Sequence, residues 1–303
     1  MSNLLSLFAN NLLPILLVAG TGYIAGRWLN VEARSISRVV FYIFSPCLIF
    51  DLLTTSQLSN SDMLRMVAFA VTSIFTVGML TFLVGRVIRL ERKMLVAVMI
   101  TTVTINAGNY GLSLNLFAFG EEALAYASLF FVTSAILTYT FGVVIASMGK
   151  ASLGTAIKGL IKIPTVYAVI LALVFIYMNW ELPLPLNRSV SLLADASIPG
   201  MLVVLGLQLQ NNHRTHNWRA LSLANGMRLL GGAGVGFILA AIIGLQGMAY
   251  NAAVLQSSMP TAVLSTILAT EYDVEPTFVT TAVFGSTILS PLTLTPLLMI
   301  LGA

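Results

Sequence analysis

Charged residues are scarce in this sequence. Asp, Glu, Lys and Arg make up 9% of the 303 residues and hydrophobic residues make up 58%, whereas a soluble domain carries about 25% charged residues. The mean hydropathy is +0.94. A soluble fold could not cover its surface with so few charged residues. The sequence therefore indicates an all-α, multi-pass membrane protein. The pI near 9.3 then reports on membrane topology and does not indicate nucleic-acid binding.

Residues that carry covalent or metal chemistry are also few. The single cysteine, Cys47, excludes an intramolecular disulfide. Only two histidines are present, His213 and His216, and two histidines without further ligands make a poor metal site. Neither a GxSxG, an HExxH nor a P-loop motif is found. We therefore expect no enzymatic activity, no cofactor and no metal ion.

Lys and Arg are absent from the first 26 residues. A cleaved signal peptide begins with a positively charged region, so we expect the first apolar segment to stay in the mature protein.

Long apolar runs occupy most of the chain. A helix needs about 20 apolar residues to cross a bilayer. Division at the charge clusters predicts ten crossings, at roughly 4–27, 36–55, 63–86, 94–118, 122–147, 163–180, 187–210, 219–245, 248–270 and 276–301.

Basic residues fall on one side of these crossings. The loops after the first, third, fifth and seventh crossings hold twelve Lys and Arg residues, and the even-numbered loops hold only Arg65 and Arg188. Because cytoplasmic loops are enriched in Lys and Arg, we expect both termini to lie outside, in a cell membrane such as the bacterial inner membrane.

Short sequence words recur at offsets of about 150 to 154. RSIS at 34–37 matches RSVS at 188–191, TSAIL at 133–137 matches GSTIL at 285–289, and Pro14 and Pro46 match Pro164 and Pro199. A duplicated unit of five crossings inserts its two copies with opposite orientation. Inverted repeats are typical of secondary transporters, whose substrate site lies where the repeats meet.

One polar stretch interrupts an apolar run in each half. NAGNYGLS at 106–113 corresponds, at offset 152, to SMPTAVLS at 258–265. A broken helix at membrane depth is tolerated when it is buried in protein or lines a cavity, and the amino ends of half-helices attract anions. The alternative is that Gly108 and Gly111 allow close helix packing while the asparagines bridge neighbouring helices.

Five segments carry a resemblance to the auxin efflux carrier family, which includes bacterial dicarboxylate permeases and plant PIN auxin exporters. They are NAGNYGLSLNLFAFGEEA, SPCLIF, LLADASIPGMLVVLGLQL, NGMRLLGG and SSMPTAVLSTILATEYDVEP. The resemblance covers essentially the whole chain. It implies two repeats, at 1–148 and 163–303, joined by a cytoplasmic linker at 149–162. It also implies a scaffold of crossings 1, 2, 6 and 7 and a mobile transport domain of crossings 3–5 and 8–10, in which crossings 4 and 9 are broken. A homodimer through the scaffold is a further implication.

Some residue roles follow from the resemblance alone. Asn106 matches an asparagine that contacts the substrate carboxylate in plant members, and Tyr139 matches a tyrosine that lines that site. Thr165 stands where those members have asparagine, which suggests a different substrate. The family's crossing prolines fall at Ser113 and Ser265, which leaves open how the helices break here. The complete set of candidate substrate-binding residues is Asn106, Gly108, Asn109, Tyr110, Ser113, Tyr139, Thr165, Ser257, Ser258, Pro260, Thr261 and Ser265.

Two charged residues interrupt the seventh and eighth crossings. A charge at the bilayer centre costs about 3 kcal/mol on insertion scales, so it normally pairs or faces water. Asp195 is interpreted either as a proton carrier or gate, or as a cap for the turn at Pro199. Arg228 is a second gating candidate, for which we favour a structural role as an interfacial or ion-paired residue.

The sequence therefore predicts a transporter of small carboxylates that works by an elevator-type movement. Two alternatives remain. A cation–proton antiporter of similar architecture is disfavoured, because neither polar stretch contains a carboxylate. A membrane sensor that binds a ligand without transporting it is not distinguished by sequence.

Overall fold

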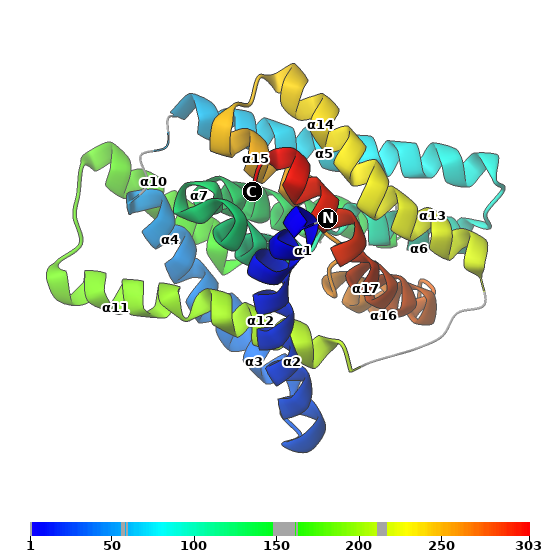
Figure 1. Cartoon of the computed structure of the whole chain (residues 1–303), viewed down its shortest axis with the longest axis horizontal. Coiled ribbons are helices and arrows are strands. Elements are labelled where there is room, and N and C mark those ends of the chain that lie inside the picture. The colour runs from blue at the N-terminus through cyan, green and yellow to red at the C-terminus, as the bar shows by residue number, and fades with distance from the viewer. Residues whose placement is uncertain (1, 56–57, 59, 148–160, 162, 211–216) are drawn as a thin grey trace.

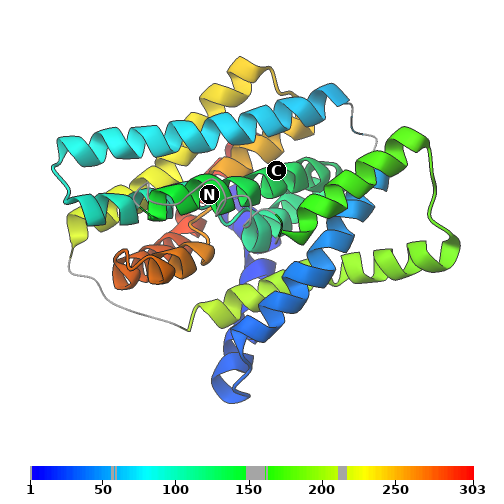
Figure 2. The same cartoon turned by 180° about the vertical axis from the view of Figure 1, so that it is seen from behind.

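The computed structural model describes residues 2–55, 58, 60–147, 161, 163–210 and 217–303. Within these ranges all regular structure is helical, and the one β-type contact is an isolated bridge between Ile105 and Thr261. Almost all of the linker predicted at 149–162 lies outside the described residues, as do both histidines. The predicted all-α membrane class is confirmed (Figures 1 and 2).

The helices of the first half follow one another with short connections. Their bounds are α1 Ser2–Leu7, η1 Phe8–Leu12, α2 Leu13–Trp28, α3 Ala33–Val39, η2 Val40–Phe44, α4 Ser45–Thr55, α5 Asn60–Val87, α6 Arg92–Val103, η3 Ala107–Leu112, α7 Ser113–Leu137, η4 Thr138–Gly142 and α8 Val143–Ala146. The elements named η are π-helical. Gly120, with φ +80°, bends α7 sharply, and this bend lies between the predicted fourth and fifth crossings.

The second half is likewise, in its described residues, a series of α-helices with one π-helical element. Its bounds are α10 Pro164–Met178, α11 Leu184–Asp195, α12 Ser197–Gln208, α13 Trp218–Gly226, η5 Met227–Gly231, α14 Gly232–Ile243, α15 Gly247–Ser257, α16 Leu264–Glu271 and α17 Pro276–Leu301. Pro164 and Pro276 stand in the first turn of their helices, where a missing N–H costs nothing.

Seven helical segments in the described residues are long and apolar enough to cross a membrane. A further apolar helix, Pro164–Met178, is shorter. Three other helices, α6, α15 and α16, have only 12, 11 and 8 residues. They are short because the chain leaves helical geometry after Val103 and after Ser257.

Helices α2 and α12 pack at very close range. A Cβ atom on Gly206 of α12 would lie 1.7 Å from the carbonyl oxygen of Ala19, and one on Gly22 would lie 2.2 Å from the carbonyl oxygen of Val203. Small residues allow such backbone contact between membrane helices. Helix α4 in turn packs against α10 and α11, so these five helices form one packed group.

A second group surrounds the short helices. Helix α5 packs along α6, α7 and α14, and α15 packs against α7 and α14. Both views place α5 and α14 beside one another along one side of the molecule (Figures 1 and 2). The two groups meet where α12 contacts η3 and where α4 contacts α7.

Candidate functional site

Two extended segments meet antiparallel in the interior. The first joins α6 to η3 and the second joins α15 to α16. The N–H of Asn106 donates to the carbonyl of Pro260 at 2.9 Å, and the N–H of Ala262 donates to the carbonyl of Thr104 at 3.0 Å. The helix is therefore interrupted at both polar stretches, and each break supplies the hydrogen bonds that the other has lost. We call this contact the crossing.

The resemblance left open whether the helices break at Ser113 and Ser265, and in the structure they do not. Ser113 begins α7 and Ser265 is the second residue of α16, so both serines lie inside helices. The chain instead leaves the helix earlier, at Thr104–Asn106 and at 258–263, where Pro260 is the residue that cannot donate to a helix.

The carboxyl ends of α6 and α15 share one cation. Arg228 in η5 is fully buried, and it donates from Nη1 to the carbonyl of Thr102 and from Nη2 to the carbonyl of Ser257. The favoured structural role thus takes a form that the sequence did not suggest, because Arg228 is buried against main-chain carbonyls and no ion pair to it is found among the described residues.

Side chains reinforce the crossing from both halves. The Thr261 hydroxyl donates to the carbonyl of Thr101 at 2.8 Å. The side-chain amide of Gln256, which is completely buried, donates to the carbonyls of Ala107 and Ala127, each at 3.2 Å. A Cβ on Gly111 would lie 2.2 Å from the Gln256 side-chain oxygen, so this glycine makes room for the amide.

The amino end of η3 lies directly after the crossing. The first four N–H groups of a helix have no partner within it, and their partial positive charge favours an anion. Asn106 immediately precedes this end and is 5% exposed. Its main chain is held by Pro260 and Gly111, while its side-chain amide makes no hydrogen bond to a described residue. The amide therefore remains available to a ligand.

Other candidate residues around η3 are engaged with the protein itself. The Ser113 hydroxyl donates to the carbonyl of Asn109 at 3.2 Å. The hydroxyls of Tyr110 and Ser290 lie 3.4 Å apart. A Cβ on Gly108 would lie 2.8 Å from the Phe131 ring, so Gly108 permits close packing, as the alternative interpretation of this glycine predicts.

The hydroxyls of the second stretch are likewise occupied. Ser257 and Ser258 both donate to the carbonyl of Val254, at 2.9 and 2.7 Å, and Ser265 donates to that of Ala262 at 2.7 Å. Pro260 and Thr261 contribute to the crossing as described above. These residues shape the site, but their hydroxyl protons are not directed at a ligand.

Tyr139 and Thr165 form no hydrogen bond with the crossing. Tyr139 is half-buried in η4. Thr165, at the start of α10, is fully buried and its hydroxyl has no partner among the described residues.

Asp195 ends α11 at the kink before α12, and its side chain is exposed. No ion pair to Asp195 is found in the described parts of the chain.

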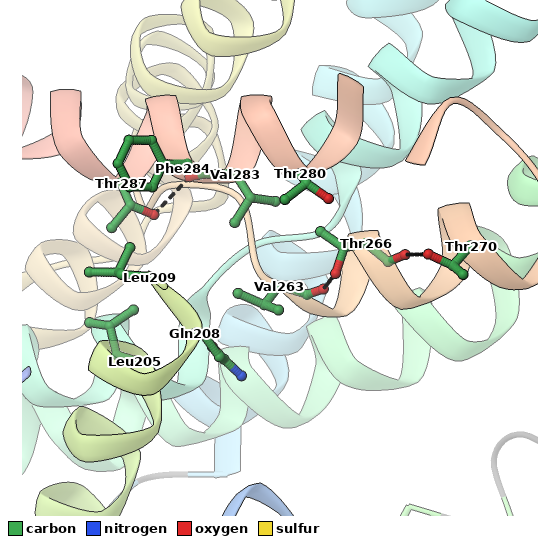
Figure 3. A pocket seen from close by; sticks show the side chains of 10 residues that line it. All are labelled: Leu205, Gln208, Leu209, Val263, Thr266, Thr270, Thr280, Val283, Phe284 and Thr287. Carbon is green, nitrogen blue, oxygen red and sulfur yellow. Dashed lines mark hydrogen bonds between the residues drawn. The ribbon is translucent and has the colours of Figure 1, made fainter. Parts of the chain in front are cut away.

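A pocket of about 310 Å³ separates α12 from α16 and α17 (Figure 3). Its lining consists of Leu205, Gln208, Leu209, Val263, Thr266, Thr270, Thr280, Val283, Phe284 and Thr287. None of the substrate-binding candidates lines it, although Val263 lies two residues beyond Thr261.

The four threonines of this pocket all donate to main-chain carbonyls of their own helices, at 2.7 to 2.9 Å. Their hydroxyl protons are thus used, and the pocket offers few donors for a carboxylate. This lining is better suited to a route for solutes than to a site that binds an anion.

Sequence reasoning missed Gln256 and Thr101 altogether. Gln256 stands one residue before the polar stretch that was singled out, and a buried polar residue beside a break is the signal that would have found it. The carbonyls of Thr101 and Thr102 accept hydrogen bonds from Thr261 and Arg228. Because every residue has a carbonyl, the side chains at these positions do not indicate this role.

Comparison with known proteins agrees with the architecture. The model of a family described as "Membrane transport protein" matches residues 7–153 and 146–298. Together these matches cover nearly the entire chain.

Relatives are found in archaea and plants. An "Uncharacterized transporter" of Methanothermobacter thermautotrophicus is 28% identical over 92% of this chain and 93% of its own length. One of Methanocaldococcus jannaschii is 25% identical over 92% and 94%. "Auxin efflux carrier component 1" of Arabidopsis thaliana is 31% identical over 43% of this chain and 21% of its own length.

Proposed function

The chain belongs to the membrane transport protein family, as the resemblance to auxin efflux carriers predicted, and we propose that it is a secondary or facilitative transporter of small organic anions. The members of this family are membrane transporters and not enzymes. The observation that carries the proposal is the crossing. Two interrupted helices at this position create an anion-attracting amino end beside the free amide of Asn106.

We propose ten crossings arranged as two inverted repeats, 1–148 and 163–303. The described helices overlap the ten predicted ranges once α7 is divided at Gly120, although several extend up to three residues beyond them. Further support comes from the two breaks, which lie at equivalent positions of the repeats and pair antiparallel.

The proposed scaffold consists of crossings 1, 2, 6 and 7, and the transport domain of crossings 3–5 and 8–10. The close glycine contacts between α2 and α12 and the packing of α4 on α10 support a rigid scaffold. The crossing, Arg228 and Gln256 bind crossings 4, 8 and 9 to one another, as expected of a body that moves as a unit.

We propose that a substrate carboxylate binds at the amino end of η3 and contacts Asn106, with Asn109 and Tyr139 as further contacts. The pocket between α12 and α16 would then be the aqueous route to this site, because it separates a scaffold helix from the transport domain. An elevator movement would close this route and open one on the other face.

The proposed topology has both termini outside. The ion pair between Lys93 and Asp273, at 3.0 Å, joins the loops after crossings 3 and 9. Arg65 donates to the carbonyl of Gly244 at 3.5 Å, which brings the start of crossing 3 beside the end of crossing 8. Each contact links parts of the chain that parity assigns to the same side of the membrane.

Two further proposals concern the oligomeric state and the coupling ion. A homodimer through the scaffold is proposed from the resemblance alone. Asp195 is proposed as the proton carrier if transport is ion-driven, since it is a carboxylate inside a crossing and is exposed. Loss of pH-driven uptake in Asp195→Asn, with exchange unchanged, would support that role.

The test of the proposed function is counterflow in proteoliposomes with a panel of mono- and dicarboxylates. A transporter accumulates labelled carboxylate against unlabelled carboxylate inside, whereas a ligand sensor binds it without accumulation. A cation–proton antiporter would instead exchange Na⁺ or K⁺ for protons and ignore the carboxylates. Protein-free liposomes and the Asn106→Asp variant are the controls.

A further inference from the structure

Arg228 brings a buried positive charge to the crossing, and no ion pair to an acidic side chain is found for it in the described part of the chain. It is among the largest fully buried side chains. A buried charge costs several kcal/mol unless it is compensated. The compensation must come from the groups that Arg228 does contact.

Those groups are the carboxyl ends of two half-helices. Thr102 lies in the last turn of α6 and Ser257 is the last residue of α15. The carboxyl end of a helix carries roughly −0.5 charge, so two such ends present about one negative charge. One guanidinium balances them, and its planar fork of donors reaches both carbonyls at once.

The surrounding backbone leaves space for this arrangement. A Cβ on Gly232, one turn after Arg228, would lie 2.3 Å from both the Ser257 carbonyl oxygen and the Arg228 guanidinium. A Cβ on Gly236 would lie 2.1 Å from the Ser257 hydroxyl. These two glycines let α14 approach the end of α15 closely enough for the arginine to reach across.

Converging main-chain carbonyls at helix ends are also how proteins hold alkali-metal ions at broken membrane helices. From this geometry we propose that Arg228 is a resident cation: its guanidinium occupies the cation position of the crossing permanently, so the crossing needs no exchangeable ion such as Na⁺. Arg228 is thus a positioning residue that holds the Asn106 backbone in register with Pro260, and it is not a gate.

Two consequences distinguish this role from ordinary core packing. Removing the positive charge should loosen the crossing specifically, which exposes the N–H groups of Asn106 and Ala262 to exchange. A hydrogen bond to a charged group corresponds to about a 10- to 150-fold change in an equilibrium constant. A small guanidinium ion added to the alanine variant should refill the position.

The experiment uses purified full-length protein in detergent, with variants Arg228→Ala, Arg228→Lys and Arg228→Gln. Met66→Ala, which removes a fully buried side chain from α5, is the matched control. Hydrogen exchange at Asn106 and Ala262 and the thermal midpoint are measured with millimolar methylguanidinium chloride, NaCl or choline chloride. No substrate is required, so the outcome is independent of the proposed anion transport.

We expect exchange at both amides in Arg228→Ala to be about 10- to 150-fold faster than in wild type and to be restored by methylguanidinium. Met66→Ala should lower the midpoint without this rescue. Arg228→Lys should retain more protection than Arg228→Gln, a comparison that decides the matter even if the alanine variant cannot be purified. Three results would each overturn the proposal: wild-type protein stabilised by NaCl relative to choline chloride, equal protection in the lysine and glutamine variants, or equal rescue of Met66→Ala.

Discussion

The main-chain N–H of Asn106 donates to the carbonyl oxygen of Pro260, 154 residues away in the chain, at 2.9 Å. This bond fixes where η3 begins, because Asn106 is the residue that precedes it. The side chain of Asn106 is consequently presented at the amino end of a helix that packs on α12. The place at which the two halves of the chain meet is therefore also the place where we propose that an anion binds.

The Asn106 amide should contribute directly to anion binding. A hydrogen bond to a charged group contributes about 1.5–3 kcal/mol, so Asn106→Ala should weaken carboxylate binding roughly 10- to 150-fold. Asn106→Asp should be worse, because it places a negative charge beside the anion. The measurement is affinity by calorimetry or competition, with thermal stability recorded alongside.

Asn109→Ala serves as the matched control for this prediction. Asn109 is half-buried one turn along the same segment, and its replacement should reduce affinity less. Wild-type affinity in both Asn106 variants, or loss of binding only through unfolding, would remove Asn106 from the site.

The contact between α2 and α12 should depend on Gly206. In Gly206→Ala the new Cβ would lie 1.7 Å from the carbonyl oxygen of Ala19, which is main chain and cannot turn aside. Overpacking of this kind costs about 1–3 kcal/mol, so the thermal midpoint should fall clearly. Gly234→Ala in α14 is the control, since nothing lies within 4 Å of the new Cβ, and alanine favours a helix by about 1 kcal/mol. Equal midpoints for the two variants would argue against the close contact.

The sequence predicts those features of the site that depend on side-chain type. The helix interruption at NAGNYG was predictable, because glycine and short polar side chains disfavour a helix. The position of the break was not, since the resemblance aligned the family's crossing proline with Ser113 and left open how the helix breaks, whereas the chain leaves the helix at Thr104. Nothing at Ser113 interrupts a helix, and its hydroxyl simply bonds back to Asn109.

The partners of Arg228 lay beyond sequence reasoning for a different reason. The sequence shows a charge inside an apolar run and suggests a carboxylate partner or the membrane interface. The actual partners are the carbonyls of Thr102 and Ser257. Every residue has a carbonyl, so no pattern of side chains marks those that a fold leaves unpaired at a helix end.

Both chain ends are predicted to face outside. Ser2→Cys and Gly302→Cys, each in a Cys47→Ser background, should react with an impermeant maleimide in intact cells. Glu91→Cys, in the loop that carries the basic residues, should react only after permeabilisation. Asn251 donates to the carbonyl of Leu301 at 3.3 Å, which sets the end of α17 beside the beginning of α15. Labelling of the two terminal positions only after permeabilisation would reverse the topology.

The last prediction concerns movement between the two groups of helices. Leu209, directly after α12, and Thr270 of α16 line the same pocket from opposite sides (Figure 3). If α12 belongs to a fixed scaffold and α16 to a mobile domain, a bifunctional maleimide joining cysteines at these two positions should arrest transport. Carboxylate binding should persist, because neither residue contacts the crossing.

Cysteines at Thr266 of α16 and Thr280 of α17 provide the matched control for this cross-link. They line the same pocket, but both belong to the proposed mobile domain, so a cross-link between them should leave transport largely intact. Counterflow before and after cross-linking measures the outcome for each pair. An elevator requires relative movement across the pocket, so unimpaired counterflow in the fully cross-linked Leu209→Cys/Thr270→Cys protein would exclude that mechanism. Equal arrest by the two pairs would point instead to a blocked route.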